Sequence, residues 1–186
     1  MEESMPGSEL ELRYERLFAQ WLERVQGELG WQIAETRPAG WIRTAYREHG
    51  ELPAARFALI AFERKLRCVL DALPPVAAAA ERDTGLRVDI RADSTPPSPD
   101  FPMGMVTVAE SAVQSFDPLG ARAEVADAVQ TNLADRYGRL WPLCPEHDSG
   151  LHAITHEGEA VWWCRAQDHP AARIPGSNPE SGPGLR

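Results

Sequence analysis

The chain has 186 residues, of which 43% are hydrophobic and 25% charged, and its formal net charge is −9. This length and balance predict one domain, or one domain with a small appendage, and exclude collagen-like, coiled-coil and largely disordered classes. No apolar run approaches the roughly 18 residues that a membrane span requires. The first eight residues lack the basic and apolar regions of a secretory signal, and three cysteines are an odd number for a disulfide scaffold. We therefore expect a cytoplasmic protein with reduced thiols and no membrane contact.

The charge balance also bears on the kind of partner. Twenty-eight acidic residues outnumber nineteen basic ones, so the chain as a whole has no attraction to phosphate backbones, which bind Lys and Arg clusters. The charge argues against nucleic acid and favours another protein, one with a basic surface.

The first predicted element is a helix from Ser8 to Leu29. Ser8 and Glu11 have the spacing of a capping box, and Gly30 is a natural stop. Apolar residues at intervals of three or four form one stripe, which we expect to face the core: Leu10, Tyr14, Leu17, Trp21, Val25 and Leu29.

Two short strands are predicted next, at Trp31–Thr36 and Trp41–Arg47, joined by a turn at Arg37–Gly40. A second helix is then predicted to begin at Pro53 and to run to about Leu73, where two consecutive prolines end it. Its apolar arc is broad, which indicates a central helix covered on more than one side.

Alternation of apolar and charged residues predicts a strand at Leu86–Ala92. The four prolines within Asp93–Pro102 predict an exposed loop, and Met103–Ala109 reads as a strand rich in Val and Thr. A third helix is predicted to open at Asp117-Pro118 and to run to about Tyr137, with Gly138 as its cap.

The predicted order is therefore α-β-β-α-β-β-α, which favours the α+β class, with an antiparallel sheet and helices packed on one side. We expect an α+β globular domain at residues 1–138 and a small hairpin module at 139–174. Residues 175–186 are rich in Pro, Gly, Ser and Asn, a composition typical of disorder.

The hairpin module carries a Cys/His constellation. Two residues separate Cys144 from His147, the interval at which two side chains of one tight turn reach the same metal. Sixteen residues then lead to Cys164, and His169 follows five positions later. Strands at Leu151–Thr155 and Ala160–Cys164, with Gly158 in their turn, would return Cys164 to the first pair. The pattern predicts a zinc site formed by these four residues.

Two alternatives remain open at this point. The fourth ligand could instead be His152, His156 or Asp148. The segment could also be a metal-free apolar hairpin with two buried thiols and exposed histidines. We favour zinc because so small a hairpin needs a stabilising cross-link such as a bound metal ion.

The residues of this segment also resemble known sequences. The run Trp141-Pro142-Leu143-Cys144-Pro145-Glu146-His147, followed by Ala160-Val161-Trp162-Trp163-Cys164, is similar to the C-terminal tail of small actinobacterial proteins with no established activity. The likeness covers about thirty residues and is of the zinc-ribbon type, which implies a metal with a structural role. In those proteins Pro commonly follows the last cysteine, whereas Arg165 follows it here.

Other candidate sites are weaker. Asp89 and Asp93 share a strand face and could form a carboxylate pair, but Arg87 and Arg91 on the same face favour a solvated charged surface. Cys68 lies in an apolar helix, where a buried inert thiol is the default. The tryptophans at 141, 162 and 163 are expected to pack the hairpin against the third helix rather than to stack on bases.

Three functions remain, in this order. The first is a non-catalytic interaction or regulatory protein with a structural zinc ion. The second is a metal-dependent hydrolase, which would need three protein ligands, an open position and a general base from Glu146, Asp148 or Glu157. The third is a nucleic-acid-binding zinc ribbon, disfavoured because the segment offers few nearby cations, namely Arg139, Arg165 and Arg173.

Overall fold

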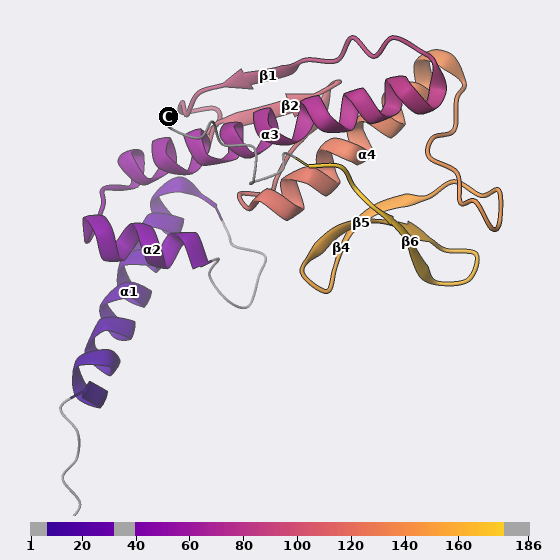
Figure 1. Ribbon diagram of the computed structural model, residues 1–186. Coiled ribbons are helices and arrows are strands. Elements are labelled where there is room, and N and C mark those ends of the chain that lie inside the picture. The colour runs from indigo at the N-terminus through magenta and orange to yellow at the C-terminus, as the bar shows by residue number, and fades with distance from the viewer. Residues whose placement is uncertain (1–6, 32–39, 177–186) are drawn as a thin grey trace, which may run out of the picture. The chain divides into compact units, whose positions relative to one another are not determined.

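The computed structural model describes residues 7–31 and 40–176, and it confirms the α+β class. The described residues form four helices and two three-stranded antiparallel sheets, with strand orders β1-β2-β3 and β4-β5-β6 (Figure 1). The chain divides into two compact units: residues 1–61 with 96–104, and residues 62–95 with 105–186. In chain order the elements are α1 (Gly7–Leu29), α2 (Gly40–His49), α3 (Ala54–Thr84), β1 (Ala92–Thr95), β2 (Met105–Val108), β3 (Ser111–Ala112), α4 (Pro118–Tyr137), β4 (His152–His156), β5 (Glu159–Cys164) and β6 (His169–Arg173).

The core of the first unit is built from aromatic rings. Trp21 of α1 is fully buried, and its ring lies 5.0 Å from that of Tyr46 and 5.5 Å from that of Phe57, centroid to centroid. Its indole N–H donates to the carbonyl oxygen of Leu52 at 2.8 Å, which satisfies the one polar atom of the side chain. The predicted first helix is confirmed, because α1 ends at Leu29 and buries part of the predicted stripe.

The strand predicted at Trp41–Arg47 is wrong, because these residues lie in the helix α2. Its buried side chains, Ile42, Ala45 and Tyr46, recur at the helical spacing of three and four. In so short a run the helical and strand patterns overlap, and contacts with the aromatic rings of α1 decide between them. Residues 32–36 of the other predicted strand lie outside the described residues.

The predicted end of the second helix at Leu73 is also wrong, because α3 continues through Pro74 and Pro75 to Thr84. The residues after the prolines extend the buried stripe, since Val76 and Ala80 are completely buried. Packing of this alanine-rich end outweighs the backbone hydrogen bonds that two prolines remove.

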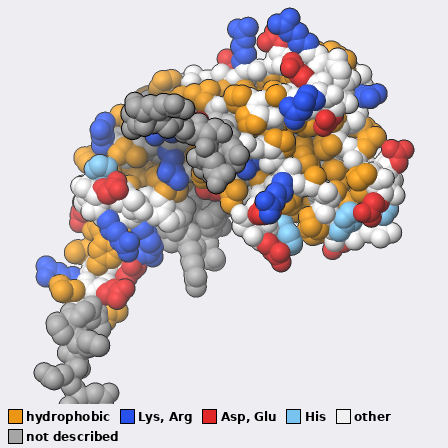
Figure 2. Space-filling model, in the orientation of Figure 1, with side chains coloured by type: hydrophobic (Ala, Val, Ile, Leu, Met, Phe, Trp, Pro, Cys, Tyr) orange, Lys and Arg blue, Asp and Glu red, His pale blue; other side chains and the backbone are white. Residues whose placement is uncertain are grey.

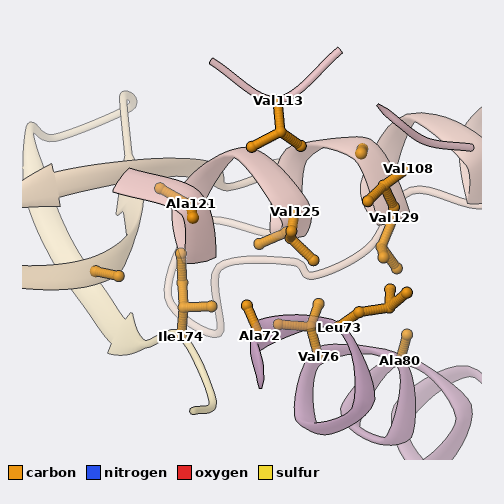
Figure 3. Packing of buried hydrophobic residues seen from close by; sticks show 14 of the residues in the cluster. Ala72, Leu73, Val76, Ala80, Val108, Val113, Ala121, Val125, Val129 and Ile174 are labelled. Carbon is orange, nitrogen blue, oxygen red and sulfur yellow. The ribbon is translucent and has the colours of Figure 1, made fainter. Parts of the chain in front are cut away.

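The core of the second unit is filled by valine and alanine. Val125 and Val129 of α4 face Leu73 and Val76 of α3, while Val113 approaches α4 from the other side (Figure 3). These small side chains allow the helices to pack closely. The helix α4 is therefore the central element of this unit.

Both ends of α4 agree with the sequence prediction. The Asp117 carboxylate accepts hydrogen bonds from the backbone N–H groups of Leu119 and Gly120. At the other end Gly138 adopts φ 59°, and its N–H donates to the carbonyl oxygen of Ala134. The positive φ is why a glycine stands here.

The first sheet differs from the prediction in two strands, because β1 is displaced and β3 was not predicted. Residues 86–91 form no strand, and β1 begins only at Ala92. The rest of β1 lies in the segment Asp93–Pro102 that was predicted as a loop, so that prediction is wrong for residues 93–95. Leu86, Val88 and Ile90 still pack against the core, while the Val88 N–H donates to the Glu81 side chain. The alternation of apolar and charged residues at 86–91 therefore arises because one side of this segment is buried, although no neighbouring strand is hydrogen-bonded to it.

The predicted strand at 103–109 is present in shortened form as β2. It pairs with β1 on one side and with β3 on the other. The β2–β3 turn consists of Ala109 and Glu110, both with positive φ, as a two-residue hairpin of this type requires.

The predicted C-terminal hairpin is present as β4 and β5, with Gly158 in its turn. A third strand that was not predicted, β6, pairs with β5 and completes the sheet. Trp141, Trp162 and Ile174 of this region belong to the same buried cluster as the α3 and α4 side chains. The division into a globular domain at residues 1–138 and a hairpin module at 139–174 stays a prediction.

Candidate metal centre

The first half of the centre is a tight turn that follows α4. Leu143 and Gly150 pair as an isolated antiparallel bridge, and inside it the Cys144 N–H donates to the Ser149 carbonyl oxygen at 2.8 Å. The Cys144 carbonyl accepts from the Asp148 N–H at 2.9 Å. These bonds close the chain on itself, so the side chains of Cys144 and His147 point to the same place.

The second half comes from the end of the β5–β6 pair. Cys164 and His169 are directly paired residues in this antiparallel register. Paired residues on neighbouring strands place their side chains on the same face. The sheet therefore adds one thiol and one imidazole to the pair from the turn.

The four ligand atoms converge. The Cys144 Sγ lies 3.3 Å from His147 Nδ1 and 3.9 Å from His169 Nε2, and the Cys164 Sγ lies 3.4 Å from His147 Nδ1. All four atoms lie within 4.8 Å of one another. Tetrahedral bonds of about 2.3 Å to sulfur and about 2.0 Å to nitrogen separate ligand atoms by about 3.3–3.8 Å. The arrangement could hold one metal ion.

The thiols are the buried part of the centre, with exposed fractions of 1% for Cys144 and 0% for Cys164. Burial alone would raise the pKa of the Cys164 thiol. Hydrogen bonds from the Ser149 hydroxyl, two backbone N–H groups and the Cys144 thiol instead lower that pKa to about 6. The surroundings therefore favour the thiolate, which is the form that binds metals.

The imidazoles lie nearer to solvent and are half-buried. Figure 2 shows histidine side chains reaching the surface over β4–β6, beside acidic ones.

Contacts with the helices hold both halves of the centre in place. The Trp141 N–H donates to the Asp83 carboxylate at 3.0 Å, and the Trp141 ring meets that of Trp162 edge to face at 5.2 Å. Gln130 of α4 donates to the Leu151 carbonyl at 2.6 Å. Trp141 and Trp162 are buried and pack the sheet against the helices, as the sequence predicted. The prediction is wrong for Trp163, which is half-buried, packs on the His156 ring and donates its N–H to Asp168.

The competing fourth ligands are not part of the cluster. The group formed among the described residues contains His169 and excludes His152, His156 and Asp148. The His156 ring instead packs on Trp163 at 4.7 Å. A four-residue connection after Cys164 returns the chain so that His169 lies directly beside this cysteine.

The other candidate residues, Cys68 and the pair Asp89 and Asp93, have the non-catalytic roles that the sequence analysis favoured. Cys68 is buried in α3, where burial raises the pKa of its thiol, so it stays protonated. Asp89 and Asp93 are exposed on the rim of a depression of about 390 Å³ that also includes Arg91, and Arg91 lies 3.8 Å from Asp89. They form a charged surface.

One buried charge was missed by the sequence analysis. Lys65, the only lysine, is 4% exposed, and its ammonium lies 4.5 Å from the centre of the Phe116 ring. Burial lowers its pKa, and the Glu124 carboxylate offsets part of the shift. Its position in the apolar arc of the second predicted helix could have indicated that this lysine is buried.

Comparison of the chain with protein-family models, curated proteins and solved structures finds no match. Among the described helices, none has both the length and the apolar character that crossing a membrane requires. The site therefore stands on its own geometry.

Proposed function

We propose that this is a non-catalytic interaction or regulatory protein in which Cys144, His147, Cys164 and His169 hold a structural zinc ion. The convergence of four protein ligand atoms within 4.8 Å is the observation that supports it. Two thiols and two imidazoles match the donor set of closed structural zinc sites.

Zinc is the metal that this donor set favours. Thiolate is a soft ligand and imidazole suits zinc, whereas Mg²⁺ and Ca²⁺ take oxygen ligands. The zinc-ribbon likeness of the sequence agrees with this choice, and we retain it as part of the proposal.

The hydrolase alternative has less support. A catalytic zinc keeps one position open for water, whereas here a fourth protein ligand is available. None of the three candidate bases, Glu146, Asp148 and Glu157, belongs to the described cluster, and all three are exposed.

The partner is the least constrained part of the proposal. The net charge of −9 supports a basic protein partner. On the face shown in Figure 2, Lys and Arg side chains are scattered among acidic ones rather than gathered in one patch, which gives no support to a nucleic-acid interface.

Metal analysis of the purified, reduced chain tests the proposal. We expect about one zinc per chain in the wild type and almost none in Cys144→Ser or Cys164→Ser. Cys68→Ser is the matched control, because this buried cysteine lies in α3 outside the cluster, and it should keep its zinc.

Two results would contradict the proposal. If the purified wild-type protein contained no metal, the assignment of a zinc site would be wrong. X-ray absorption showing three protein ligands and one water oxygen would replace the structural role with the catalytic one.

A further inference from the structure

The last strand of the sheet, β6, is an edge strand with an irregular pairing. It lies at the edge of the β4-β5-β6 sheet, and its pairing with β5 contains a register irregularity at Trp162/Trp163. Pro170, its second residue, has no N–H to donate. These features leave β6 with fewer backbone hydrogen bonds than a central strand, so contacts at its two ends contribute to its order.

The two ends of β6 are fixed in different ways. At the start, His169 contributes its Nε2 to the metal cluster. After the end, the Ile174 N–H donates to the Ala160 carbonyl oxygen at 2.9 Å, and the Ile174 side chain is only 2% exposed. Residues 169–176 form what we call the strap.

The strap covers apolar side chains of the core. In Figure 3 the Ile174 side chain points toward Ala121 of α4, with Ala72 of α3 beside it. Further along, Gly176 lies against the Arg122 guanidinium of α4, and a Cβ at this position would require that flexible side chain to move. If the strap leaves, Ile174 leaves the core with it.

Two of the other ligands are fixed independently of the strap. Cys144 and His147 lie in the bridged turn, next to the Gln130–Leu151 bond, whereas Cys164 ends β5, where its register partner is His169 itself. His169 is the one ligand that belongs to the strap. Its Nε2 lies 3.9 Å from the Cys144 Sγ, farther than the 3.3 Å and 3.4 Å that separate His147 Nδ1 from the two sulfur atoms.

We propose that the metal centre is a latch for the strap: with metal bound, His169 fastens residues 169–176 across the core, and loss of the metal releases them and uncovers the apolar surface beside Ala72 and Ala121. This inference rests on the proposed function, since it needs metal binding at the cluster. It adds that metal occupancy controls whether one apolar surface is accessible.

Hydrogen exchange of the full chain, followed by mass spectrometry, tests the latch with zinc-loaded and chelator-treated protein. Peptides covering the Ile174 amide should exchange about tenfold faster or more after zinc removal, as expected when a local opening becomes easier. Peptides within α4 should exchange as before. Adding zinc back should restore the slow exchange.

A pair of histidine variants locates the effect. His169→Ala should show fast exchange at Ile174 even with zinc present, with β4 and α4 unchanged. His156→Ala is the matched control, because His156 lies on β4 outside the cluster, and it should behave as the wild type.

The outcomes separate this inference from the function on which it rests. Wild-type protein that binds no zinc overturns both. Zinc-binding protein whose strap exchange is unchanged after measured zinc loss overturns the latch alone. Equal loss of protection in α4 and the strap also overturns it, because the metal would then support the whole unit.

Discussion

The two compact units keep their folds in different ways. The first buries large rings, among them Phe18, Trp21 and Phe57, which fill a core with few residues. The second buries mainly valine and alanine and adds the small β4–β6 sheet with its thiols and imidazoles. A small sheet has little apolar surface to bury, and a metal site can supply the missing stability.

Metal removal should have the largest effect on stability, and it should affect the second unit and not the first. Structural zinc binding contributes about 10–16 kcal/mol in zinc-finger peptides, so chelation should loosen β6 and the end of β5 beside Trp162, and leave α4 and the rings of the first unit packed. Near-ultraviolet circular dichroism during thermal unfolding would show an earlier partial transition. In Cys164→Ser the chelator should have no further effect, and an equal effect there would contradict the assignment.

Truncating a ring should affect the first unit instead. Trp21→Ala should lower the free energy of unfolding by about 3–5 kcal/mol, because it leaves a cavity and removes the bond to Leu52. Denaturant unfolding measures this, and metal analysis should still find the zinc. Trp21→Phe, which keeps an aromatic ring, should cost less. Loss of zinc in Trp21→Ala would show that the two regions are not separate in stability.

The helix cap of α4 gives a smaller effect in the second unit. Asp117→Ala should lower the free energy of unfolding by about 1 kcal/mol, since two N–H groups lose their acceptor. Asp117→Asn, which keeps an oxygen acceptor, should be close to the wild type. A change of several kcal/mol in the alanine variant would mean that Asp117 has a role beyond capping.

The buried ammonium of Lys65 predicts a pH effect, the smallest of these. Its pKa is lowered by burial, so between that value and the ordinary 10.5 the unfolded chain binds more protons than the folded one. Folding stability contributed by this residue must therefore rise with pH across that window. Relative to Lys65→Met, wild-type protein should gain stability in denaturant unfolding as the pH rises toward 10.5. A constant difference would show that Lys65 titrates normally.

Elements with strong local signals could be predicted from the sequence. The cap residues Asp117 and Gly138 define α4 without reference to the rest of the chain. The four residues of the cluster also follow from local spacing, because a turn and a hairpin bring them together. In both cases short-range geometry is sufficient.

The errors arise where contacts distant in sequence decide the structure. The run at Trp41–Arg47 fits a strand or a helix until the rings of α1 are present. The helix α3 passes through Pro74 because Val76 and Ala80 are buried against partners far along the chain. The alternation at 86–91 marks a buried side, but it cannot reveal that no strand lies alongside.

The order in which the chain visits the two units limits how it can be divided. It passes from the first unit to the second within α3, returns for residues 96–104, and then crosses back. Neither unit is therefore a continuous stretch of sequence, and no single cut yields a self-contained fragment. Exchange of one unit between genes would need several breakpoints, so recombination would pass the two on together.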